Sequence, residues 1–204
     1  TALIDGAINR KGSVGLDSSY ATVLCTGASY SSSMEKVVKD TAYITEILLL
    51  GEPESRIKNT FNTFIDKAAL TFLDENLHPV FTWDNSVLKN YNLLMEHFSN
   101  DVRYMLFRGA LTSSFVKTLY ENKHKAGNLT IGVNYPSNCL ISKKAYDTLK
   151  SLNIQLITLN KAKPLCLCAN PVSPYGYAFD EKEFVAALKK NIKLPVYNVL
   201  RGIS

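Results

Sequence analysis

The stretch TVLCTGASYSSSMEKVVKDT, residues 22–41, decides the fold because a single glycine turn joins a strand pattern to a helix pattern. Apolar residues 22–25 predict a buried strand, and Gly27 follows it as a turn residue. Ser32 and Glu35 then form a candidate capping box, after which apolar residues recur at helical spacing. A buried strand that leads into an amphipathic helix is typical of an α/β fold.

The same alternation continues along the chain, because further apolar runs are separated by amphipathic stripes. We therefore predict an α/β fold with three layers, in which helices cover both faces of a mainly parallel central sheet. Residues 54–77 fit this alternation less well and predict one more helix beside the sheet. We expect a single domain over residues 1–204, with a two-lobed division near residues 75–80 as the alternative. The predicted strands are Ala2–Ile4, Thr22–Cys25, Val80–Trp83, Arg103–Phe107, Leu129–Val133, Ile154–Leu159, Leu165–Ala169 and Val196–Leu200.

Composition and charge argue against nucleic-acid and membrane partners. The net charge of +5 comes from scattered lysines, and the densest basic cluster, residues 123–125, is too short for a nucleic-acid footprint. The longest apolar run, Ile47–Leu50, is far shorter than the roughly 20 residues that span a bilayer. We expect neither partner.

Four cysteines occur, at positions 25, 139, 166 and 168. Cys166 and Cys168 alternate with leucines, which is typical of a buried strand, and no histidine lies near them in the sequence to complete a zinc site. Reduced cysteines of this kind favour a cytoplasmic protein.

Small residues follow three predicted strands in the same pattern: Asp5-Gly6-Ala7, Thr26-Gly27-Ala28 and Arg108-Gly109-Ala110. Ligands of parallel sheets lie outside the carboxyl ends of the strands, so these glycines are candidates for a binding site. The alternative interpretation of these glycines is structural, because α/β folds commonly place small residues at such turns. We expect Gly27 and Gly109 to lie at the same edge of one sheet.

The serine-rich turn after Gly27 is the best candidate for an anion site. Ser29 and Ser31, followed by two more serines, lead directly into a helix N-terminus, where hydroxyl and backbone N–H groups suit phosphate or carboxylate. The alternative is that these serines only cap the helix. Two proline-containing loops, which begin at Asn134 and Asn170, also follow predicted strands. Either both loops line a binding site at one edge of the sheet, or they are only rigid turns.

No catalytic residue can be assigned from motifs, since the chain contains no nucleophile elbow and no metalloprotease motif, and its three histidines fit structural roles better. Asp5 is the one acidic residue at the carboxyl end of an apolar strand. Such a strand resembles a Walker B segment, whose carboxylate holds Mg²⁺. The P-loop that usually precedes a Walker B strand does not occur in these 204 residues, so we expect this chain to be the carboxyl-terminal portion of a longer protein.

Three segments carry a resemblance that spans nearly the whole chain: LIDGAINRKGS, VLCTGASYSSSMEKVVKDT and NPVSPYGYAFDEKEFVAAL with the later LPVYNV. Together they resemble a little-characterised bacterial family, the reactivating ATPase subunit of lysine 5,6-aminomutase, an enzyme of amino-acid fermentation.

The resemblance implies a chaperone-like NTPase that uses nucleotide hydrolysis to exchange inactivated cobalamin in a B12-dependent aminomutase. It implies that Asp5 faces Mg²⁺ of a bound nucleotide, with Gly6, Asn9, Arg10 and Lys11 in the adjoining segment. Without a P-loop we expect this chain alone to be inactive, whereas the full-length protein would be an ATPase or GTPase. Two alternatives stay open: a stand-alone α/β domain that binds a small anion, and a small-molecule enzyme whose site the sequence hides.

Overall fold

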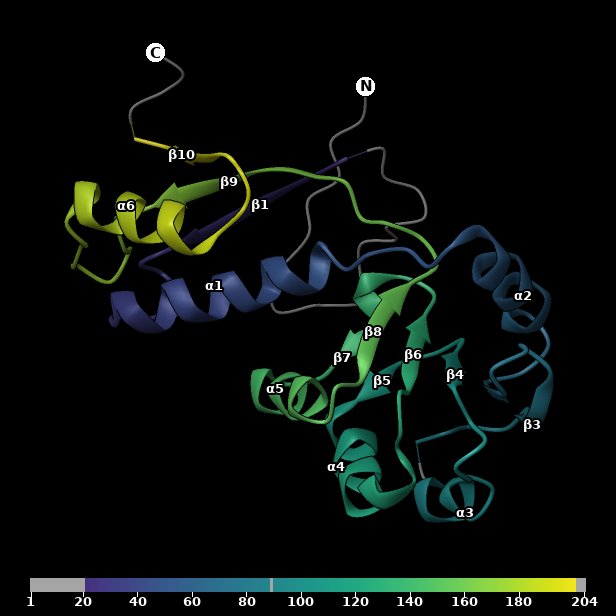
Figure 1. The fold of residues 1–204 in the computed structure, drawn as a ribbon. Coiled ribbons are helices and arrows are strands. Elements are labelled where there is room, and N and C mark those ends of the chain that lie inside the picture. Colours follow the sequence, from purple (N-terminus) through teal and green to yellow (C-terminus); the bar gives the residue numbers. More distant parts are fainter. Residues whose placement is uncertain (1–20, 89, 201–204) are drawn as a thin grey trace. The chain divides into compact units, whose positions relative to one another are not determined.

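The computed structural model describes residues 21–88 and 90–200, which divide into two compact units (Figure 1). Unit 1 combines Thr1–Leu49 with Ala162–Ser204, and unit 2 is the intervening segment Leu50–Lys161. These boundaries do not coincide with the division expected near residues 75–80. That region instead connects two strands that pair with each other inside unit 2.

The described part of unit 1 contains three strands and two helices. Strand β1 (Thr22–Gly27) is followed by helix α1 (Met34–Leu48), and after unit 2 the chain returns as β9 (Pro164–Asn170), helix α6 (Glu181–Asn191) and β10 (Val196–Asn198). The sheet order is β1-β9-β10, and both pairings are parallel. Each later strand lies on the same side of the strand before it, so the sheet order follows the chain order. Right-handed crossovers between such strands place both connecting helices on the same face of the sheet.

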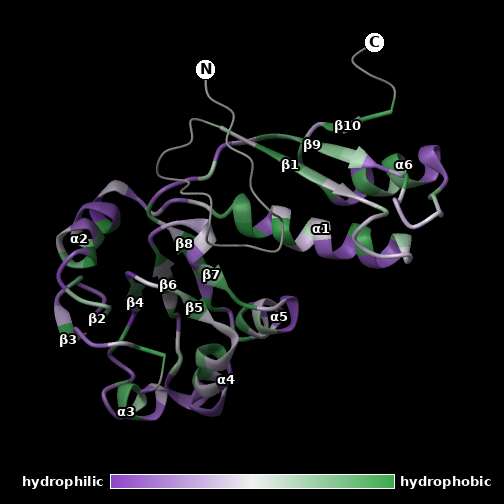
Figure 2. Ribbon diagram, turned by 180° about the vertical axis from the view of Figure 1, so that it is seen from behind, coloured by the Kyte–Doolittle hydropathy of each residue, from purple (hydrophilic) through white to green (hydrophobic). Residues whose placement is uncertain are grey.

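The core of unit 1 lies between this face and the two helices. Leu167 and Ala169 of the central strand β9 are fully buried, and the apolar sides of α1 and α6 pack onto them. Hydrophilic and hydrophobic residues alternate along both helices in Figure 2, as expected for helices that bury one side. The cluster comprises Val37, Val38, Leu167, Ala169, Phe184, Leu188, Ile192 and Val196.

Unit 2 contains a five-stranded mixed sheet of order β3-β2-β4-β6-β8 and a small parallel sheet, β5-β7. Strand β2 runs antiparallel to both of its neighbours, whereas β4, β6 and β8 are parallel. Its elements are α2 (Ser55–Ile65), β2 (Leu70–Leu73), β3 (Pro79–Trp83), α3 (Tyr91–Glu96), β4 (Tyr104–Phe107), β5 (Leu111–Thr112), α4 (Ser113–Glu121), β6 (Thr130–Val133), β7 (Cys139–Leu140), α5 (Lys143–Ser151) and β8 (Gln155–Thr158), with 3₁₀ turns at Lys123–Lys125 and Pro136–Asn138.

Apolar residues of β4 contact helices in unit 2. Leu106 belongs to a buried cluster with Phe61 of α2, while the ring of Phe107 lies edge-on to that of Phe115 in α4, with centroids 4.8 Å apart. Gly132 of β6 leaves room for Phe61, because a Cβ at this position would lie 2.5 Å from the Phe61 ring.

The predicted α/β class is confirmed, but the prediction of one mainly parallel central sheet is wrong. The strands within residues 21–88 and 90–200 belong to three sheets, and the largest of these is mixed. The predicted helix over residues 54–77 ends at Ile65, and Phe72 lies in β2. A tight turn held by the Asp74 carboxylate, which accepts from the backbone N–H of Asn76 and of His78, returns the chain to form β3. So short a connection can only join antiparallel strands.

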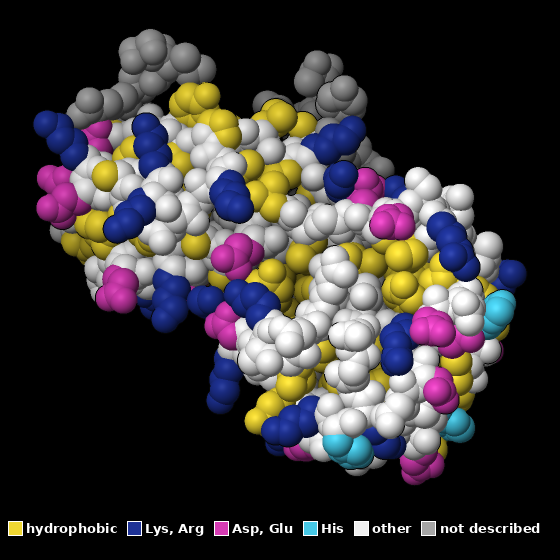
Figure 3. Space-filling view, viewed as in Figure 1, with side chains coloured by type: hydrophobic (Ala, Val, Ile, Leu, Met, Phe, Trp, Pro, Cys, Tyr) yellow, Lys and Arg dark blue, Asp and Glu magenta, His cyan; other side chains and the backbone are white. Residues whose placement is uncertain are grey.

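No helix within residues 21–88 and 90–200 is long and apolar enough to cross a membrane. On the face drawn in Figure 3, Lys and Arg side chains are interspersed with Asp, Glu and uncharged residues. That face therefore carries charge of both signs.

Candidate functional site

The turn between β1 and α1 is held against the end of β9 by backbone contacts. Gly27 and Asn170 are register partners at the carboxyl ends of the two parallel strands. The Ala28 N–H donates to the Asn170 carbonyl oxygen at 2.9 Å, and the Tyr177 hydroxyl donates to the Ala28 carbonyl oxygen at 2.6 Å. Two segments that are about 140 residues apart in the sequence therefore form one edge in unit 1.

Gly27 is required by this close approach of the two backbones. A Cβ built on Gly27 would lie 2.2 Å from the Asn170 carbonyl oxygen and 3.0 Å from the Asn170 Cβ. The absence of a side chain at residue 27 thus allows Ala28 to donate its hydrogen bond to β9.

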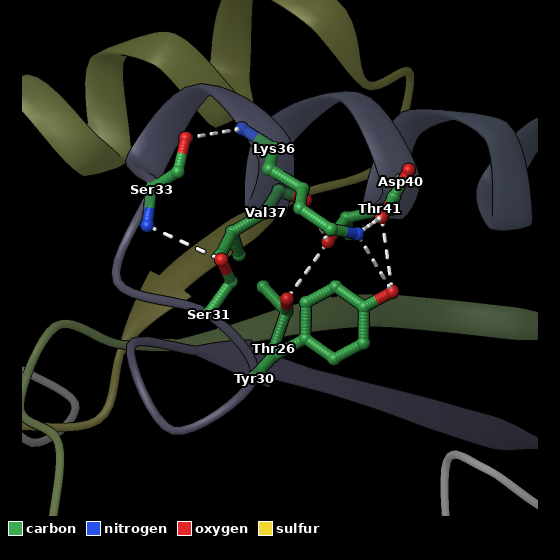
Figure 4. A network of polar contacts seen from close by, with 8 residues as sticks. All are labelled: Thr26, Tyr30, Ser31, Ser33, Lys36, Val37, Asp40 and Thr41. Carbon is green, nitrogen blue, oxygen red and sulfur yellow. Dashed lines mark hydrogen bonds and ion pairs between the residues drawn. The ribbon is translucent and has the colours of Figure 1, made fainter. Parts of the chain in front are cut away.

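Two serines of the turn accept hydrogen bonds at the start of helix α1, as Figure 4 shows. Ser33, rather than the predicted Ser32, is the N-cap residue: its hydroxyl accepts from the Lys36 backbone N–H at 3.2 Å. The Ser31 hydroxyl accepts from the Ser33 N–H, also at 3.2 Å. The Ser31 hydroxyl thus binds the N-cap residue and not the first turn of the helix, while the N–H groups of Met34 and Glu35, in that first turn, have no intrahelical partner.

Lys36 and Asp40 form an ion pair on the side of α1, one turn apart (Figure 4). The Lys36 ammonium lies 2.5 Å from the Asp40 carboxylate, which also accepts from the Tyr30 hydroxyl at 2.9 Å. Hydrogen bonds to Asp40 and then to Tyr30 raise the pKa of Lys36. Burial alone would raise the pKa of Asp40, but the bonds from Lys36 and Tyr30 lower it overall. The lysine charge next to the turn is therefore balanced within the chain.

Asn170 starts a stiff loop that returns the chain to helix α6. Its side-chain oxygen accepts from the Val172 N–H at 3.0 Å, which forms a local turn. Gly176 has a φ of 85°, in the region that favours glycine. Asp180 then caps α6 by accepting from the Glu183 N–H at 2.9 Å, as its sequence pattern predicts.

Gly109 and Asn134 lie in unit 2, after strands β4 and β6, and so belong to a different sheet from Gly27. The expectation that Gly27 and Gly109 share one sheet edge is therefore wrong. The Asn134 side-chain oxygen accepts from the Asn160 amide at 2.7 Å, which ties the ends of β6 and β8 together. No atom lies within 4 Å of a Cβ built on Gly109, so no close approach explains this glycine.

Of the sequence-predicted site residues, the structure thus brings Gly27, Ser29, Ser31 and Asn170 to one end of unit 1. Asp5 and Gly6 lie outside the described residues, as do Asn9, Arg10 and Lys11. Lys36, Asp40 and Tyr177 were not predicted as site residues, although the four-residue spacing of Lys36 and Asp40 is a signal for an ion pair on a helix.

The described part of the chain offers little for metal or acid–base chemistry. Within it, no group of three or more His, Cys, Asp or Glu side chains has an arrangement that could hold a metal ion. Two of the histidines have structural partners: His97 stacks on Phe81 with centroids 4.0 Å apart, and His78 lies 3.5 Å from the Asp74 carboxylate. The strand-end turn of unit 1 is suited to binding an anion through backbone N–H groups rather than to proton transfer.

Comparison with known proteins adds no relative. No protein-family model matches the chain, and neither a curated protein nor a solved structure is significantly similar to it.

Proposed function

We propose that the chain is part of a nucleotide-dependent protein that reactivates a B12-dependent aminomutase, and that unit 1 supplies one side of its nucleotide site. The observation that carries the proposal is the pairing of Gly27 with Asn170, which places the turn into α1 at the carboxyl edge of a parallel sheet. The aminomutase and the cytoplasmic location come from the sequence resemblance and the cysteine pattern, respectively.

The geometry of the turn favours a phosphate group. Helix α1 has 15 residues, and the N–H groups of its first turn, with the positive end of its dipole, attract anions. Gly27 allows the ends of β1 and β9 to approach closely, which holds the turn into α1 at the carboxyl edge of the sheet. Lys36, a cation in the first turn of α1, is paired with Asp40. We therefore expect weak binding by this chain alone and assign no charge-stabilising role to Lys36.

Hydrolysis requires more than this turn supplies. Phosphoryl transfer uses a lysine-bearing phosphate cradle and a Mg²⁺ carboxylate, for which the resemblance offers Asp5. We accordingly propose Mg-nucleotide as a cofactor of the full-length protein and binding without turnover for residues 1–204. The alternative function, a stand-alone domain that binds a small anion, would use the same turn. Such a domain would bind inorganic phosphate more tightly than nucleotide, whereas a nucleotide site would show the opposite preference.

Asn170→Asp tests the site with little change in shape. The aspartate keeps the oxygen that accepts from the Val172 N–H but adds a negative charge at the strand end. Asn134→Asp is the matched control, because its side-chain oxygen also accepts a hydrogen bond, from Asn160. A charge about 7 Å from a phosphate, at an effective dielectric constant of about 50, costs roughly 1 kcal/mol per phosphate charge, or about fivefold in affinity.

Isothermal titration calorimetry with Mg-ATP, Mg-ADP and inorganic phosphate measures the effect. We expect Asn170→Asp to weaken Mg-ATP binding at least about fivefold and Asn134→Asp to leave it unchanged. Equal affinity in wild type and Asn170→Asp would refute the site. A preference for phosphate over nucleotide would favour the anion-binding domain. Reactivation itself is tested by adding the full-length protein and ATP to an inactivated B12-dependent aminomutase, where no recovery of mutase activity would refute that role.

A further inference from the structure

Three of the four cysteines lie on one face of the three-stranded sheet in unit 1. Cys25 of β1 is the register partner of Cys168 of β9, and Cys166 lies two residues before Cys168 on the same strand. Side chains alternate along a strand, and α1 and α6 pack onto Leu167 and Ala169. The three cysteines therefore lie on the face opposite the helices, where Cys25 is exposed and Cys166 and Cys168 are half-buried.

The Cα separation of register partners such as Cys25 and Cys168 is one that a disulfide allows. Neighbouring strands lie about 4.8 Å apart, which is within the Cα separation of about 4.4–6.8 Å found in disulfides. Cys166 and Cys168, two residues apart on one strand, are separated by about 6.6 Å, near the upper limit of that range. None of the four cysteines is in a disulfide in the structure, so the pair is present as thiols.

The third thiol of the cluster, Cys166, is half-buried. Burial, and then the nearby Cys168 and Cys25 thiols, raise the pKa of Cys166. Because the thiolate is the nucleophile, this shift lowers the reactivity of Cys166. A metal ion does not explain the cluster, since no three such side chains within the described residues are arranged to hold one.

We propose that Cys25 and Cys168 form a reversible dithiol site that a hydroperoxide oxidises to a disulfide. The exposed Cys25 thiolate attacks one peroxide oxygen, so that an S–O bond forms, the O–O bond breaks and hydroxide leaves to become water. The Cys168 thiolate then attacks the Cys25 sulfenic sulfur; the S–S bond forms, the S–O bond breaks, and a second hydroxide leaves as water. Two thiols lose two electrons and hydrogen peroxide is reduced to two waters.

This site is independent of the proposed nucleotide function, although Cys25 lies only two residues before Gly27 on β1. A disulfide would draw the two strands together next to the edge where Gly27 already meets Asn170.

Peptide mapping after hydrogen peroxide tests the proposal. The reduced chain is treated with peroxide, alkylated and digested with trypsin without reduction. We expect a linked pair of peptides, residues 12–36 with residues 162–182, lighter by two hydrogen atoms and separated by dithiothreitol. The peptide of residues 126–143 is the internal control, because its Cys139 is buried and lies in the other unit. Cys139 should remain fully alkylated.

Single variants identify the partner of Cys25. Cys168→Ala should abolish the link and leave Cys25 to oxidise to sulfinic or sulfonic acid, whereas Cys166→Ala should retain the link. The reverse pattern would overturn the pairing of Cys25 with Cys168. Absence of any link in the wild-type chain, or links only between Cys25 residues of two chains, would overturn the proposal itself.

Discussion

Replacement of Gly27 by alanine should disrupt the junction of β1 and β9, although it adds only one methyl group. The new Cβ would lie 2.2 Å from the Asn170 carbonyl oxygen, and ordinary contact begins at 3.4 Å. The two backbones must therefore separate by about 1.2 Å at this point. A shift of that size lengthens the 2.9 Å hydrogen bond from Ala28 to Asn170 beyond hydrogen-bonding distance.

The expected cost follows from these two effects. Overpacking against a backbone that cannot rotate away costs about 1–3 kcal/mol, and loss of one backbone hydrogen bond adds roughly 1 kcal/mol. We therefore expect Gly27→Ala to lower the free energy of unfolding of unit 1 by about 2–4 kcal/mol. For a unit of fewer than 100 residues this lowers Tm by at least about 8 °C.

Gly109→Ala is the matched control, because Gly109 also precedes an alanine but no atom lies within 4 Å of its Cβ position. Its stability should stay within about 0.5 kcal/mol of wild type. Thermal unfolding followed by circular dichroism measures both variants, and amide hydrogen exchange locates the change in β1 and β9. The reasoning is refuted if Gly27→Ala is as stable as wild type, or if the two variants lose stability equally.

Two further substitutions test contacts in unit 2. Gly132→Ala should cost about 1–3 kcal/mol, because its Cβ would lie 2.5 Å from the ring of Phe61, which is fully buried and cannot swing aside; urea unfolding measures it. Hydrogen bonds from Lys58 and then Lys161 lower the pKa of Glu52, so Glu52→Gln should lose about 0.5 kcal/mol at pH 7. This difference should be full above the ordinary glutamate pKa and should diminish as the pH falls through the lowered pKa of Glu52; a difference that does not diminish with falling pH would contradict this.

The local structure of the chain could be predicted well from the sequence. Amphipathic spacing is visible in the sequences of α1, α4, α5 and α6, because each buries one apolar side. The Asp180 cap was also predictable, since an acidic residue three positions before Glu183 is a short-range signal. The α1 cap was displaced by one residue because three consecutive serines offer equivalent hydroxyls, and only the backbone conformation selects Ser33.

The sheet arrangement could not be predicted, because strand partners are chosen by contacts that the local pattern does not contain. The short strand β2 carries apolar residues that also fit a helix, so periodicity did not distinguish the two. Pairing of β1 with β9 across the inserted unit 2 has no sequence signal of its own. The predicted single sheet followed from assuming that strands near in sequence are neighbours in space.

The glycine pattern shows the same limit within the candidate site. Thr26-Gly27-Ala28 and Arg108-Gly109-Ala110 look equivalent in the sequence, yet Gly27 meets another backbone and Gly109 meets nothing within 4 Å. The difference comes from Asn170, whose carbonyl oxygen receives the Ala28 hydrogen bond. A strand-end glycine is therefore better evidence for a binding edge when the backbone of the neighbouring strand approaches it closely and accepts a hydrogen bond from the next residue. By that criterion Gly27 and Asn170, rather than Gly109 and Asn134, are the pair to mutate first.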